Sequence, residues 1–127
     1  MPYDLHVVRT QDFLRCNSEG VFDYSGTKIG LKAIAQACIA RGVKCVLLDV
    51  RDAQSTLKMT DMYQLAHTFQ ETGFTQDHRL AILHRYRAGE RAEFFALCAQ
   101  ERGWNIAAFE SYEEAVNWFS PPIEEIK

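Results

Sequence analysis

Carboxylate, arginine and hydroxyl side chains gather directly after an apolar run at residues 45–48. Residues 49–60 read DVRDAQSTLKMT and include Asp49, Arg51, Asp52, Ser55 and Thr56. In an open α/β sheet, ligands bind beyond the carboxyl ends of the strands. These residue types can hold an anion, provide a catalytic carboxylate or accept a phosphoryl group. We therefore predict a loop over residues 49–60 that binds a partner or a ligand.

A second group of charged residues follows the next apolar run. Residues 84–91 read HRYRAGER and hold Arg85, Arg87 and Arg91 beside a predicted helix N-terminus. Arginines next to free backbone N–H groups can bind a phosphate or a carboxylate. The alternative is that these arginines form exposed ion pairs, worth about 0–1 kcal/mol each, with Asp49, Asp52 or Glu90.

Hydroxyl groups near the start of the second predicted helix have two interpretations. Ser55 and Thr60 are candidate phosphorylation sites, where close to two negative charges would remodel the loop. Thr60 followed by Asp61 also fits a helix N-cap with a favourable charge against the helix dipole.

The sequence gives little support for an enzyme. It has no G-x-S-x-G nucleophile elbow, no G-x-G-x-x-G or Walker A pattern, and no histidine–carboxylate spacing typical of a metal site. A small hydrolase-like site is the third hypothesis, and it depends on one set of residues near strand ends: Asp49, Arg51, Asp52, Ser55 and His84. We predict no catalytic residue, no metal and no cofactor.

Hydrophobic periodicity predicts an α/β fold. Short strands are expected at residues 5–8 and 13–16, joined by a turn around Thr10 and Gln11, and at residues 45–48, 80–83 and 105–109. Helices are expected at residues 27–41, 62–69, 90–102 and from a capping box at Ser111 to Phe119. The order β-β-α-β-α-β-α-β-α implies a single-domain mixed, mainly parallel sheet with an antiparallel edge hairpin.

Composition limits the range of functions. The 127 residues suit one domain, expected over residues 1–120 with a short tail at 121–127. A net charge of −3 gives no basic face for nucleic acid, and no apolar run is long enough to span a bilayer. The four cysteines form no C-x-x-C pair, and three of them have apolar neighbours, as buried reduced thiols do. We expect a cytoplasmic protein.

Three segments carry a resemblance to a known family. They are VLLDVRD after the first helix, RLAIL in the next strand, and RGWNIAAFESYEEAVNWF at the end. With the element order, they make the chain resemble bacterial STAS-like proteins of the SpoIIAA-like branch, the anti-sigma-factor-antagonist fold that is related to the CRAL-TRIO fold. In that family, a serine after the central strand is phosphorylated by a partner kinase. Ser55 is the residue that the resemblance points to, although the family's adjacent Asp-Ser pair and following glycine are absent.

We therefore expect a non-enzymatic regulatory STAS-like module. It would bind a protein partner or a small anionic ligand through residues 49–60 and 84–91. The alternative is a carrier or sensor of an apolar or lipid ligand, held in a pocket between sheet and helices. Six aromatic residues are available to line such a pocket: Phe69, Phe74, Phe94, Phe95, Trp104 and Trp118. A homodimer is a further expectation.

Overall fold

The computed structural model describes residues 4–9 and 13–119, the former as backbone only. The strands are β1 (Asp4–Arg9), β2 (Leu14–Phe22), β3 (Cys45–Ser55), β4 (Arg79–Leu83) and β5 (Asn105–Phe109). The helices are α1 (Tyr24–Arg41), α2 (Met59–His67), α3 (Glu90–Gln100) and α4 (Tyr112–Phe119), with a short 3-10 turn, η1 (Phe69–Thr72), after α2. The predicted element order is confirmed.

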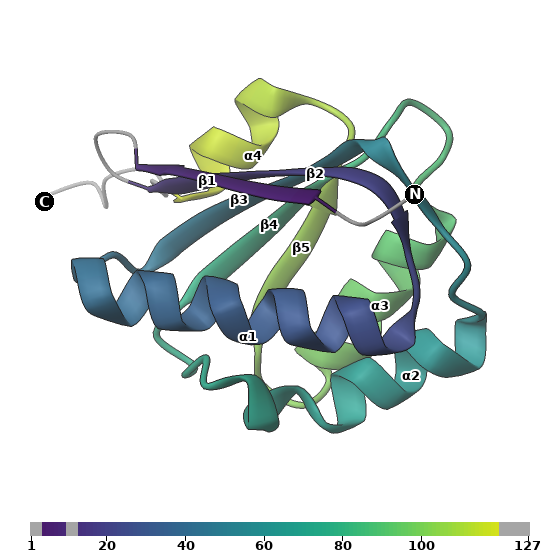
Figure 1. Cartoon of the computed structure of the whole chain (residues 1–127), viewed down its shortest axis with the longest axis horizontal. Helices are drawn as coiled ribbons and strands as arrows, with labels where there is room; N and C mark the ends of the chain where they lie inside the picture. Colours follow the sequence, from purple (N-terminus) through teal and green to yellow (C-terminus); the bar gives the residue numbers. More distant parts are fainter. Residues whose placement is uncertain (1–3, 10–12, 120–127) are drawn as a thin grey trace, which may run out of the picture.

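The five strands form one sheet in the order β1-β2-β3-β4-β5 (Figure 1). β1 pairs antiparallel with β2, and all other pairs are parallel. The predicted edge hairpin is therefore confirmed. Its turn around Thr10 and Gln11 lies outside the described residues, as does the predicted tail at 121–127.

The helices cover the two faces of the sheet unequally. In Figure 1, α1, α2 and α3 lie on one face and α4 lies on the other. Successive strand residues alternate between these faces. Val46 and Leu48 of β3 pack in the larger core beneath α1–α3, whereas Leu47 packs with Ala115 and Phe119 of α4. This alternation decides which polar residues of β3 can meet.

β3 is much longer than the predicted strand, and this overturns one prediction. Residues 49–55 are strand, so the loop predicted over residues 49–60 shrinks to residues 56–58. The reason is that β2 is also long and continues to pair with β3 as far as Phe22 opposite Ser55. β4 ends opposite Asp49, so residues 50–55 have a strand neighbour only in β2.

The helix boundaries and buried faces differ from the prediction at several positions. α1 begins earlier, at Tyr24, because the carboxylate of Asp23 accepts a hydrogen bond from Gly26 N at 2.8 Å. Gly42 ends α1 with φ of 67°, as predicted. Ile39 is 62% exposed, although it continues the helical spacing of the buried Leu31, Ile34, Ala35 and Cys38. In this alanine-rich helix, apolar residues occur on more than one face, so spacing alone does not identify the buried stripe.

The same ambiguity affects the last two helices. In α3 the buried stripe is Phe95, Ala96, Cys98 and Ala99, whereas the apolar Leu97 is 54% exposed. In α4 the ring of Tyr112 is also exposed. The predicted cap of α4 is present in part, since Glu114 N donates to Ser111 Oγ at 3.3 Å.

The cysteines are free thiols. Cys16, Cys38 and Cys98 are buried, and Cys45 is half-buried.

Candidate functional site

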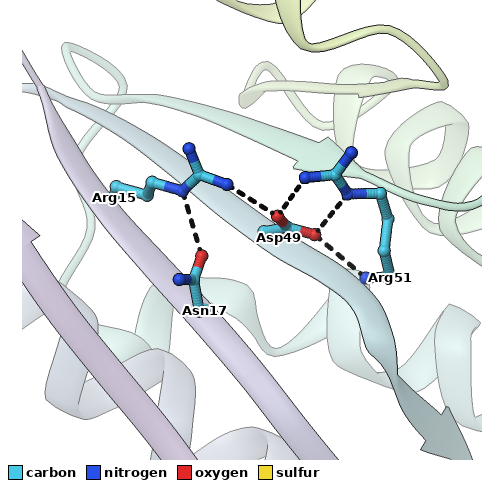
Figure 2. Close-up of polar contacts among 4 residues, drawn as sticks. All are labelled: Arg15, Asn17, Asp49 and Arg51. Atoms are coloured by element: carbon cyan, nitrogen blue, oxygen red, sulfur yellow. Dashed lines mark hydrogen bonds and ion pairs between the residues drawn. The ribbon is translucent and has the colours of Figure 1, made fainter.

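Two groups of polar residues lie on opposite faces of the sheet, near the point where β4 ends opposite Asp49 of β3. The first, which we call the arginine–aspartate cluster, consists of Arg15, Asn17, Asp49 and Arg51 (Figure 2). The second lies around a cavity beneath α1–α3, which we call the apolar pocket. Leu48 and Val50 line the pocket and so point to the face opposite Asp49. The register between β2 and β3 shifts between Asp49 and Asp52, which changes the alternation, so Ser55 also reaches the pocket.

The carboxylate of Asp49 is the centre of the arginine–aspartate cluster. Its Oδ1 accepts hydrogen bonds from the backbone N and the Nε of Arg51, both at 3.0 Å. Its Oδ2 accepts from Arg51 Nη2 at 2.7 Å and from Arg15 Nη2 at 3.0 Å. Arg15 Nε donates to Asn17 Oδ1 at 3.1 Å, and its guanidinium lies 5.2 Å from the ring centre of Tyr112. Asp49 is thus held by two cations at once (Figure 2).

The electrostatics of Asp49 are set by two opposing effects. Burial alone raises the pKa of this carboxyl, but the hydrogen bonds from the Arg51 side chain and backbone, together with that from Arg15, outweigh burial and lower it. Asp49 in turn raises the pKa of Arg51. The carboxylate is therefore ionised and fully engaged at neutral pH, and the cluster fastens β2 to β3 where β4 ends.

These contacts correct the predicted pairing. Asp49 was a possible partner for the arginines of residues 84–91, but the described partners are Arg15 and Arg51. Arg15 was not among the candidate residues. A signal was available, because pairing residues 13–16 beside 45–48 brings Arg15 and Asp49 to the same face of neighbouring strands.

The apolar pocket has a volume of about 340 Å³. Its walls are mainly apolar and come from the sheet and three helices: Leu48, Val50 and Ile82 of the sheet, Leu31 of α1, Met62 and Leu65 of α2, and Phe95 of α3. Ser55, Arg85, Ala88 and Arg91 also line it, and the last three are exposed, so they mark its opening. A cavity of this size is in the range of small-molecule sites.

The opening is held by contacts between the two chain segments that the sequence singled out. Ser55 Oγ accepts a hydrogen bond from Leu57 N at 3.0 Å. Arg91 Nε donates to the carbonyl of Leu57 and so joins the start of α3 to the segment before α2. Arg85 lines the opening, and its side chain forms no hydrogen bond or ion pair with the residues that the structure describes, which leaves its guanidinium available to a ligand.

His84 is the most deeply buried polar residue in the pocket wall, at 3% exposure. Its Nδ1 lies 2.9 Å from the carbonyl oxygen of Arg85. Its Nε2 has no hydrogen-bond partner in the described part of the chain, and the carboxylate of Glu93 is 3.7 Å away. Gly89 packs directly against the ring, since a Cβ at that position would lie 2.1 Å from Cε1.

The remaining predicted residues lie outside the pocket. Arg87 has φ of 59°, its backbone N donates to Glu110 at 3.0 Å, and its guanidinium lies over the ring of Tyr86. Asp52 and Thr56 are exposed. Thr60 is inside the first turn of α2 and does not cap it, because Lys58 occupies the N-cap position. Asp61 accepts from Lys58 N at 2.9 Å, so its predicted place at the helix start is confirmed.

The hydrolase-like set does not form one site. Asp49 bonds Arg15, whose guanidinium lies over the ring of Tyr112 in α4, whereas Ser55 and His84 line the pocket on the opposite face. Among the described residues, no group of three or more metal-ligating side chains could hold an ion. No helix in residues 4–9 or 13–119 is long and apolar enough to cross a membrane.

The predicted aromatic lining of a pocket is largely wrong. Of the six aromatic residues proposed, only Phe95 is part of the wall. Phe69 stacks on Phe74 and meets Trp104 edge to face, and Trp118 packs against Phe109 on the α4 face. Aliphatic side chains from the sheet and α2 form most of the wall instead.

Comparison with known proteins supports the fold independently of these details. No family model and no curated protein sequence matches the chain. Among solved structures, an anti-sigma factor antagonist from Mycobacterium paratuberculosis aligns over 94% of this chain and 96% of its own, with a TM-score of 0.62 and 14% identity. An uncharacterised protein with a SpoIIAA-like fold from Shewanella loihica PV-4 covers 91% and 92%, with a TM-score of 0.57 and 17% identity.

The unphosphorylated form of the anti-sigma factor antagonist SpoIIAA is also similar. It covers 96% of this chain and 100% of its own, with a TM-score of 0.54 and 12% identity. The chain therefore has the SpoIIAA-like fold, and the predicted resemblance is confirmed at the level of the fold.

Proposed function

We propose that the protein is a non-enzymatic regulatory module that binds a small, mainly apolar anion in the apolar pocket. The pocket of about 340 Å³ between the sheet and α1–α3 is the observation that carries this proposal. Its position at the carboxyl ends of β3 and β4 is where α/β sheets bind ligands. The proposal joins two earlier hypotheses, because residues of both predicted binding segments meet at the opening of one apolar cavity.

The chemistry of the pocket favours a ligand with one charged end. Aliphatic walls gain free energy by burying apolar surface, about 25 cal/mol per Å². Arg85 and Arg91 at the opening are suited to a carboxylate or phosphate. Arg91 already donates to the Leu57 carbonyl, so Arg85 has the more available guanidinium. An apolar chain inside and an anionic group at the opening satisfy both parts of the site.

The regulatory part of the proposal draws on the structural neighbours. Two of them are named anti-sigma factor antagonists, which act on a protein partner. In this chain a ligand would contact α2 and α3 together, since Met62, Leu65 and Phe95 line the pocket. Binding of a ligand in the pocket would thus change the exposed surface of α2, which we expect a partner protein to contact. We place this activity in the cytoplasm.

Phosphorylation would act on the same opening. Ser55 Oγ accepts from Leu57 N at the pocket, and Thr60 is exposed one turn further on. A phosphoryl group on Ser55 would break that hydrogen bond and put negative charge beside Arg91, in competition with an anionic ligand. Native mass spectrometry of the protein from its own cells would reveal a retained ligand, a phosphoryl group or a homodimer in one experiment.

Binding is tested by calorimetric titration with straight-chain carboxylates. We expect Arg85→Ala to weaken binding about tenfold, the loss expected for one charge-assisted hydrogen bond at a partly exposed site. The matched control is Arg87→Ala, which removes the same charge from the same loop but lies outside the pocket. The free energy of unfolding of both variants should lie within about 0.5 kcal/mol of the wild-type value. Equal losses in both variants, or no binding of any carboxylate to the wild type, would contradict the proposal.

A further inference from the structure

The end of β3 gives the apolar pocket a wall that includes main-chain groups. Ala53, Gln54 and Ser55 all line the pocket. In a parallel pair of strands, the N–H and C=O of one residue point to the same neighbouring strand, and those of the next residue point to the opposite side. Thr56 N donates to the carbonyl of Phe22 in β2 at 3.1 Å, and the register between the strands is regular here. The N–H and C=O groups of Ala53 and Ser55 therefore point away from β2.

No strand pairs with this side of β3 in the described residues. β4 ends with Leu83 opposite Asp49, and within residues 4–9 and 13–119 the main chain of Ala53 and Ser55 forms no hydrogen bond on the side away from β2. Ala53 is nevertheless only 7% exposed. Nearly all buried backbone groups in proteins have a hydrogen-bond partner. The pocket is thus bounded by a short strand edge that can pair with a further strand.

We propose that the ligand of the apolar pocket is an extended peptide with a free terminal carboxylate, which adds to β3 as a short further strand. This inference rests on the proposed function and deepens it, because it names the chemical class of the apolar anion. The peptide main chain pairs with Ala53 and Ser55, an apolar side chain enters the pocket, and the carboxylate binds Arg85. The main-chain hydrogen bonds contribute affinity, and the side chain in the pocket contributes specificity.

A straight-chain acid is the competing occupant. It would fill the same apolar volume and reach Arg85, but it has no N–H or C=O groups along its chain. The main chain of Ala53 and Ser55 would then stay unpaired, which lowers the free energy gained on binding. A peptide matches all three features of the site, namely the aliphatic walls, the arginine at the opening and the strand edge.

The first experiment is a calorimetric titration of the wild type with N-acetylated trileucine that has a free carboxyl terminus. It is repeated with peptides in which one amide nitrogen at a time is methylated, which removes a single N–H donor and keeps the side chains and the carboxylate. The N–H groups of an extended peptide point alternately toward β3 and away from it. We expect methylation to weaken binding about tenfold where the N–H points toward β3 and less than about twofold at the adjacent position, which is the matched control.

Amide hydrogen exchange tests the strand edge in the protein itself. In the free protein, the Ser55 amide should exchange faster than the Thr56 amide, which is bonded to the Phe22 carbonyl. Saturation with trileucine should slow exchange at Ser55 about tenfold more than saturation with octanoate, which fills the pocket without pairing with β3. The Thr56 amide is the internal reference, because both ligands should affect it equally.

The outcomes separate this inference from the proposed function. If straight-chain acids bind and trileucine does not, or if methylation has the same effect at every position, the peptide inference fails and the pocket proposal stands. If neither class of acid binds, both fail. Equal protection of the Ser55 amide by octanoate and by trileucine also overturns the peptide inference.

Discussion

Gly89→Ala gives a direct test of how His84 is held. A Cβ at position 89 would lie 2.1 Å from Cε1, 2.2 Å from Nε2 and 2.5 Å from Nδ1 of that ring. Ordinary contact begins at 3.4 Å, so the ring must move by more than 1 Å. The φ of Gly89 is −103°, which any residue adopts, so backbone strain adds nothing. The effect is steric.

The magnitude follows from where the ring can go. His84 is buried, and the open space beside it is the apolar pocket. Overpacking of this kind costs about 1–3 kcal/mol. Gly89 is also the N-cap of α3, where alanine costs up to about 1 kcal/mol more. We expect a total loss of about 1–4 kcal/mol and weaker ligand binding, because the displaced ring enters the pocket.

A double-mutant cycle separates the two contributions. Unfolding by urea would be measured for the wild type, Gly89→Ala, His84→Ala and the double variant. Without the ring, only the capping cost should remain, so the coupling free energy should be about 1–3 kcal/mol. Gly26→Ala is the control, since its Cβ would meet only the Asp23 carboxylate at 3.1 Å. A cost of Gly89→Ala that is the same with and without His84 would refute the steric reasoning.

Two further predictions concern buried ionisable groups. Asp49→Asn should destabilise the protein by about 1–3 kcal/mol at pH 7, below the range for a fully buried pair because both arginines are partly exposed. The control is Asp77→Asn, which alters an exposed pair with Lys44 and should cost under about 1 kcal/mol. The pKa of Asp49 is lowered on folding, so the stabilisation by its carboxylate is present above about pH 4 and is lost as the pH falls through the pKa of the folded state. Urea unfolding at pH 7 and pH 3 should therefore show that the difference in unfolding free energy between wild type and Asp49→Asn shrinks at the lower pH. A constant difference would contradict this direction of the pH dependence. Burial raises the pKa of Cys16 to about 12 and that of Cys38 to about 11, so neither thiol should react with a disulfide reagent at pH 8 until denaturant is added; rapid modification of either in the native protein would show that α1 opens readily.

Local patterns alone were sufficient for the order of the elements. The unbroken apolar runs at residues 45–48 and 80–83 correspond to strands covered on both faces. Gly42 ends α1 in a left-handed conformation that glycine adopts without strain. These features depend on neighbours in the sequence, so no tertiary information was needed.

The length of β3 could not be read from its own residues. Its second half, VRDAQS, has the polar composition of a loop. It is a strand because β2 continues beside it and supplies hydrogen-bond partners as far as Phe22. Pairing between strands far apart in the sequence thus outweighed local propensity.

Contacts between distant parts of the chain also determined which residues form the site. The sequence identified Asp49, Ser55, Arg85 and Arg91 as candidates, and the structure places them in the middle of β3, at its end, after β4 and in the first turn of α3. Strand pairing put Asp49 with Arg15 on one face, whereas an irregular register between β2 and β3 beyond Asp49 and the packing of α1–α3 left Ser55, Arg85 and Arg91 around the pocket on the other. The cavity itself arises from side chains of the sheet and three helices, so it exists only when the fold has brought those elements together.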